Sequence, residues 1–110
     1  MKAIEKIRFE KALKEHFDRI NDLGLGELLL FSKDLPRFVE KESCRTRLLN
    51  RVVGICGWKT SAREFVRMVS YEDFRHRHHM SDMTVLGLKL FLFYVCGVDW
   101  EKPDAVVKIL

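Results

Sequence analysis

The stretch 47–97 constrains the fold most, because short apolar segments alternate there with turn-forming and helix-capping residues. Gly57 ends one helical pattern, and Ser61, with an acidic residue three positions later, has the spacing of a capping box that opens the next. Ser70 precedes two acidic residues, which suit the positive end of a helix dipole. The segment 81–84 is a predicted hairpin before a long apolar pattern. The sequence therefore predicts a run of short helices that ends in a helix–hairpin–helix unit.

A chain of 110 residues is large enough to bury one hydrophobic core, so we expect a single domain over residues 1–110. Hydrophobic residues make up 47% of the chain and only two prolines interrupt it, which favours regular elements. The alternation typical of strands is scarce, whereas good helix formers are abundant. The predicted fold class is therefore all-α, a compact bundle of short helices. The last long helix, residues 84–96, is apolar nearly all round and is expected to pass through the middle of the domain.

The pattern divides the domain into three segments. They are an N-terminal helical extension (residues 1–42), the helix–hairpin–helix module (residues 43–98) and a C-terminal tail (residues 99–110). Within the extension we predict helices over residues 3–22, 27–32 and 36–42. The first of these carries an apolar stripe and ends at the glycines near residue 24. The stripe consists of Phe9, Leu13, Phe17 and Ile20. Pro36 opens the third helix, and Ser43 caps the next one, which runs to residue 56.

Positive charge concentrates in the predicted module. Residues 1–42 carry nine basic and nine acidic side chains, whereas residues 43–98 carry nine basic and only four acidic ones, a balance of +5. A surface that contacts phosphate requires such an excess. The alternative is an ordinary solvated helical surface, and charge alone does not separate the two.

Six short motifs follow one another between residues 45 and 100. They are Arg47-Leu48-Leu49-Asn50, Gly57-Trp58-Lys59-Thr60, Glu64-Phe65-Val66, Ser70-Tyr71-Glu72-Asp73-Phe74, the hairpin around Ser81, and the helix start Thr84-Val85. In order and apolar pattern they resemble the C-terminal domain of the bacterial RNA polymerase alpha subunit, which is a helix–hairpin–helix domain. The large assembly domain of that subunit has no counterpart here.

The resemblance implies a non-enzymatic DNA-binding or transcription-associated module that contacts the DNA backbone and minor groove. An arginine at position 47 suits the negative potential of that groove, and Asn50 on the same helix face can bond to phosphate or to a base edge. Backbone N–H groups at the start of the last helix would face phosphate. The implied partner is double-stranded DNA bound with low sequence specificity, or a protein of the transcription machinery. The predicted DNA-binding residues are Arg47, Asn50, Arg51, Ser81, Thr84 and Lys89.

Three positions depart from the family pattern. Ser81 replaces the hairpin glycine, Met83 stands where the family usually has lysine, and Gly87 replaces an acidic residue. These changes leave open whether the hairpin still approaches phosphate. The alternative function is a protein–protein interaction adaptor that uses the same fold without DNA binding. The N-terminal helices would either cap the module or form a homodimer face.

Other kinds of chemistry lack the residue spacing that they need. We find no glycine-rich phosphate loop, no paired-carboxylate site and no Cys–His spacing for catalysis, so we expect that the protein is not an enzyme. The histidines at 76, 78 and 79 suggest a metal, but zinc sites need ligands that converge from several points. We therefore expect no metal and no cofactor. The odd number of cysteines, the charged N-terminus and the lack of a membrane-spanning apolar run predict a reduced, cytoplasmic protein.

Overall fold

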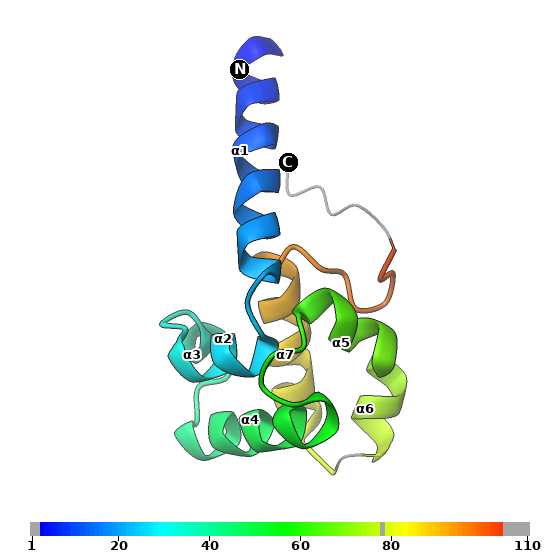
Figure 1. The fold of residues 1–110 in the computed structure, drawn as a ribbon. Coiled ribbons are helices and arrows are strands. Elements are labelled where there is room, and N and C mark those ends of the chain that lie inside the picture. The colour runs from blue at the N-terminus through cyan, green and yellow to red at the C-terminus, as the bar shows by residue number, and fades with distance from the viewer. Residues whose placement is uncertain (1–2, 78, 105–110) are drawn as a thin grey trace.

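The computed structural model describes residues 3–77 and 79–104, and every regular element in this part of the chain is a helix. The predicted all-α fold class is thereby confirmed. Figure 1 shows the first helix projecting from a body that the other helices form. In chain order the helices are α1 (Ala3–Asn21), α2 (Leu25–Phe31), α3 (Leu35–Phe38), α4 (Glu42–Cys56), α5 (Ala62–Met68), α6 (Tyr71–Arg77) and α7 (Asp82–Tyr94).

Serine side chains cap the start of three of these helices, two of them, at Ser61 and Ser70, as the sequence predicts. Ser61 Oγ accepts a hydrogen bond from the backbone N–H of Glu64 at 3.2 Å, and Ser70 Oγ accepts one from Asp73 at 3.1 Å. Ser81 caps α7, which therefore begins at Asp82, two residues earlier than predicted. Each cap satisfies a backbone donor that has no partner within its own helix.

One hydrophobic core joins the two halves of the chain. Helix α2 packs on α4, and α3 packs on both α4 and α7. The buried side chains come from the extension (Leu25, Leu28, Leu29, Leu35, Val39) and from the module (Leu48, Val52, Phe65, Phe74, Val85, Leu88, Phe91, Leu92). The helices before residue 42 thus complete the core that the module would otherwise expose.

The glycines near residue 24 do not end the first helix as predicted. Helix α1 stops at Asn21, while Gly24 precedes α2 and Gly26 lies inside it. A Cβ on Gly24 would lie 1.9 Å from the carbonyl oxygen of Trp58, and Leu25 donates its N–H to the carbonyl oxygen of Thr60 at 2.7 Å. Gly24 is therefore required because the loop after α4 packs directly against this backbone.

The boundary between α3 and α4 also differs from the prediction. Helix α3 ends at Phe38, four residues short of the predicted end, and α4 begins at Glu42 without a side-chain cap from Ser43. The intervening backbone is held by Arg45, whose guanidinium donates to the carbonyl oxygens of Val39 (2.9 Å) and Glu40. These hydrogen bonds connect a residue of α4 to residues that the sequence assigned to the preceding helix. Helical periodicity does not predict such contacts between elements.

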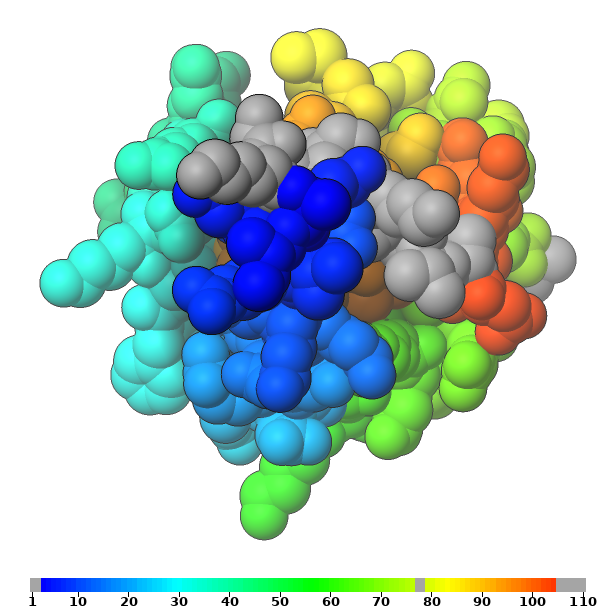
Figure 2. Space-filling view, turned by 90° about the horizontal axis from the view of Figure 1, so that it is seen from above, coloured from blue at the N-terminus to red at the C-terminus, as the bar shows by residue number. Residues whose placement is uncertain are grey.

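Only the end of α1 packs on the body. Phe17 is buried and Ile20 half-buried, whereas Phe9, on the same predicted stripe, is 46% exposed. Asn21 fixes this end, because its amide nitrogen donates to the carbonyl oxygen of Cys96 at 2.8 Å and its amide oxygen accepts from the N–H of Arg63 at 3.3 Å. Figure 2, which looks down on the helix, shows α1 (blue) standing over the body.

Helix α7 packs on α3, α4 and α6, as expected of a central helix, but one stripe of its surface is exposed. Its inner face is fully buried, but Met83, Leu86, Leu90 and Tyr94 are each more than a third exposed. Val95, directly after the helix, is half-buried. The helix is apolar nearly all round, yet the described helices leave this one stripe uncovered. Residues 105–110 of the predicted tail lie outside those residues.

Gly87 lies where two helices pack closely, and this position gives a stability prediction. A Cβ at this position would lie 2.4 Å from the carbonyl oxygen of Phe38, because α3 packs closely on α7 there. We expect Gly87→Ala to lower the free energy of unfolding by about 1–3 kcal/mol in urea denaturation, despite the better helix propensity of alanine. Gly54→Ala is the control, since a Cβ at Gly54 meets nothing within 4 Å. A Gly87→Ala protein as stable as the parent would contradict this close packing.

Candidate nucleic-acid interface

The polar face of α4 forms one side of an open pocket. Arg47, Asn50, Arg51 and Gly54 recur at the spacing of one helix face and are all exposed, whereas Leu48 and Val52 on the opposite face are fully buried. The pocket has a volume of about 420 Å³ and is lined by Arg47, Asn50, Arg51, Gly54, Ile55 and Met80. Three of the six predicted DNA-binding residues are therefore brought together.

The segment between α6 and α7 forms the other side of this pocket. The Arg47 guanidinium donates to the carbonyl oxygen of His79 at 3.3 Å, and Met80 lines the pocket. His79 has a φ of 50°, in the left-handed region that turns the chain sharply. The start of α4 thus meets the residues that precede α7, although 32 positions separate Arg47 from His79 in the sequence.

Ser81 and Thr84 hold the start of α7. The backbone N–H of Thr84 donates to Ser81 Oγ at 3.2 Å, and the two hydroxyl oxygens lie 2.8 Å apart. Thr84 is only 6% exposed. Both hydroxyls are therefore engaged in capping the helix, while Arg47, Asn50 and Arg51 remain exposed.

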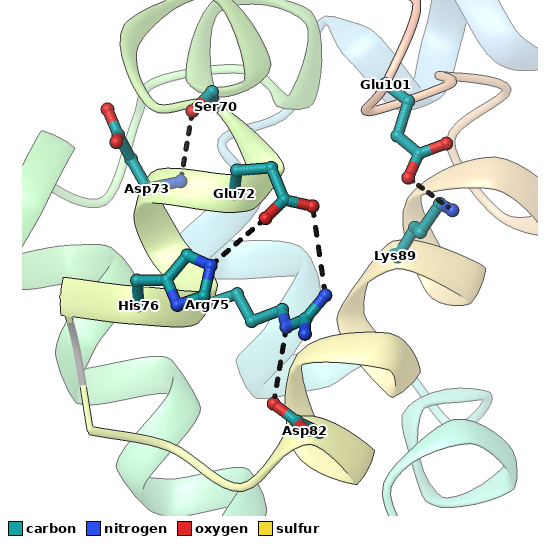
Figure 3. A network of polar contacts seen from close by, with 8 residues as sticks. All are labelled: Ser70, Glu72, Asp73, Arg75, His76, Asp82, Lys89 and Glu101. Atoms are coloured by element: carbon teal, nitrogen blue, oxygen red, sulfur yellow. Dashed lines mark hydrogen bonds and ion pairs between the residues drawn. The ribbon is translucent and has the colours of Figure 1, made fainter.

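Lys89 is directed toward a different part of the molecule. Its Nζ lies 3.2 Å from a carboxylate oxygen of Glu101 and 4.9 Å from the centre of the Tyr71 ring. Figure 3 shows this pair between α7 and the segment after it. The lysine does not line the pocket of Arg47 and is not brought together with the other predicted residues.

Most other arginines of the body have acidic partners. Figure 3 shows Arg75 held between Glu72 (3.8 Å) and Asp82 (3.5 Å). Further pairs in the described part of the chain are Arg37–Asp34 (3.7 Å), Arg63–Asp18 (3.0 Å) and Arg67–Asp104 (3.2 Å). Within residues 3–77 and 79–104, no carboxylate forms an ion pair with Arg47 or Arg51. These two guanidiniums are therefore exposed, and no carboxylate of the described residues pairs with their positive charge.

The described residues show no constellation that suits a metal. No three of the His, Cys, Asp and Glu side chains in the described part of the chain come together as ligands, and the ring of His76 lies 3.2 Å from Glu72. All three cysteines are free thiols, and burial raises the pKa of Cys96 to about 12, because a thiolate there would lose its hydration. No described helix has both the length and the apolar character needed to cross a bilayer.

Comparisons of the chain with protein-family models, with curated proteins and with solved structures gave no significant match. The geometry also adds Gly54, Ile55, His79 and Met80 to the residues that the sequence singled out. Gly54 lies seven positions after Arg47, so helical periodicity could have placed it on the same helix face. The placement of His79 and Met80 depends on tertiary contacts.

Proposed function

We propose that this protein is a non-enzymatic DNA-binding module that contacts the DNA backbone and minor groove with the exposed face of α4. The observation that carries the proposal is the pair Arg47 and Arg51, which lack carboxylate partners in the described structure and line a pocket with Asn50. A guanidinium is the side chain best suited to phosphate and to a narrow minor groove. The likeness of residues 45–100 to the polymerase alpha C-terminal domain supports an association with transcription.

The chemistry of this face favours low sequence specificity. Contacts from arginine to phosphate fix a protein on the duplex but carry no sequence information. Asn50 is the one neutral hydrogen-bonding side chain in the pocket lining, and the minor groove offers it a degenerate pattern of acceptors. We therefore expect binding to many duplexes with similar affinity.

Binding should weaken as salt rises, because neutralised phosphates release condensed counterions. With two phosphate contacts from Arg47 and Arg51, we expect affinity to fall roughly tenfold between about 50 and 200 mM salt. Fluorescence anisotropy of a short labelled duplex, titrated at both concentrations, measures this change. A second duplex of scrambled sequence serves as the specificity control. No binding at the lower salt, or an affinity that salt leaves unchanged, would contradict the proposal.

A protein–protein adaptor is the second candidate, and one observation favours it. Met83, Leu86, Leu90 and Tyr94 form an exposed apolar face along α7, and Met83 is 76% exposed. Contiguous apolar surface of this kind is typical of protein interaction sites. A chain that binds no DNA at low salt would give this candidate first place. A homodimer through the N-terminal helices stays a prediction.

A further inference from the structure

Gly54 differs from the other five glycines of the chain. Each of those five either adopts a positive φ or would place a Cβ within 3.0 Å of another residue. The values of φ are 79° at Gly57 and 67° at Gly97, and the Cβ contacts are 1.9 Å at Gly24, 3.0 Å at Gly26 and 2.4 Å at Gly87. Gly54 lies within α4, has no positive φ, and a Cβ there would meet nothing within 4 Å. Neither the backbone nor the packing of the described chain requires a glycine at this position.

A glycine inside an exposed helix destabilises it relative to alanine. Gly54 therefore destabilises α4, and no contact within the described chain compensates for this. Its position suggests a role in ligand binding, because Gly54 lines the same pocket as Arg47, Asn50 and Arg51. Lacking a side chain, it leaves the backbone of α4 exposed where the helix lines the pocket.

The lining of the pocket matches the chemistry of one kind of ligand. Two guanidiniums and an amide suit a phosphate group, while Ile55 and Met80 provide an apolar wall of the kind that packs against the carbon atoms of a sugar. A sugar–phosphate strand carries both features side by side. It also needs close approach to the helix, which a side chain at position 54 would prevent.

We infer that Gly54 lets DNA approach α4 closely: the missing side chain leaves an opening into which the sugar–phosphate backbone of one strand fits. This inference rests on the proposed DNA binding and adds the point of closest approach. It assigns the pocket lined by Arg47, Asn50, Arg51, Gly54, Ile55 and Met80 as the place where the sugar–phosphate backbone of that strand lies.

The test separates stability from binding by filling the opening in two steps. Gly54→Ala should raise the melting temperature by about 4–8 °C, because alanine favours the helix, and should bind a labelled duplex less tightly than the parent. Gly54→Leu should lower the affinity at low salt roughly tenfold or more, which is the effect of losing one good contact. Thr46→Leu is the matched control, since Thr46 is exposed on α4 and does not line the pocket.

Each result decides the inference. Affinity that falls from the parent to Gly54→Ala to Gly54→Leu, with Thr46→Leu unchanged, supports it. If Gly54→Leu unfolds, the alanine variant alone decides, because its higher melting temperature shows that the fold is intact. A parent that binds DNA, with glycine-54 variants that bind equally well, overturns the inference and leaves the proposed function standing. A parent that binds no DNA overturns both.

Discussion

Replacing Trp100 by alanine is expected to lower the free energy of unfolding by about 3–5 kcal/mol, the largest effect on stability that we predict. The side chain is 2% exposed, and its ring centre lies 5.3 Å from that of Phe74 and 5.4 Å from those of Phe65 and Tyr71. Its Nε1 donates to the carbonyl oxygen of Val69 at 2.8 Å. Truncation would therefore leave a cavity among aromatic rings and an acceptor without its donor.

The second tryptophan provides the control for this experiment. Trp58 is 45% exposed, so Trp58→Ala removes a side chain of the same size from a much less buried site. We expect it to cost well under half as much in urea denaturation. Since small domains have about 5–15 kcal/mol of total stability, the Trp100 variant should melt far below the parent. Equal losses for the two variants would show that residue 100 is not part of the core.

The second large effect concerns binding. The double variant Arg47→Ala with Asn50→Ala should lose roughly 1–3 kcal/mol of DNA-binding free energy for each good contact removed. Both side chains are exposed, and within the described part of the chain the hydrogen bond that ties them to the body is the one from Arg47 to the His79 carbonyl oxygen. The fold should therefore persist, as circular dichroism and a melting curve would show, while anisotropy reports the loss of binding.

A matched control excludes a simple effect of net charge. Arg37→Ala removes the same charge from a side chain that is 79% exposed and lies in a different part of the chain. It should bind DNA nearly as well as the parent, whereas Arg47→Ala alone should bind less well. A double variant that melts like the parent and still binds DNA equally would mean that the contacts of the polymerase domain are not made here. The adaptor function would then be favoured. A double variant that unfolds would show that Arg47 or Asn50 has a structural role.

The sequence predicted part of the candidate site. The spacing of Arg47, Asn50 and Arg51 places them on one helix face, and the structure confirms that all three are exposed there. The sequence did not predict which basic residues form ion pairs with carboxylates, because these pairs join distant segments. Arg63 pairs with Asp18, Arg67 with Asp104, and Lys89 with Glu101. An excess of +5 over residues 43–98 therefore says little about where the free positive surface lies.

By itself, the sequence determined the helices whose signals are local. Ser61 and Ser70 cap α5 and α6, and Gly57 follows α4 in the left-handed region, because each of these signals acts within one turn of its own helix. Only the tertiary structure decided how those helices pack. It exposes one face of the apolar α7, leaves most of α1 outside the core, and requires Gly24 and Gly87 where two backbones meet. These features depend on contacts between residues far apart in the chain, and helical periodicity carries no information about which neighbour covers a face.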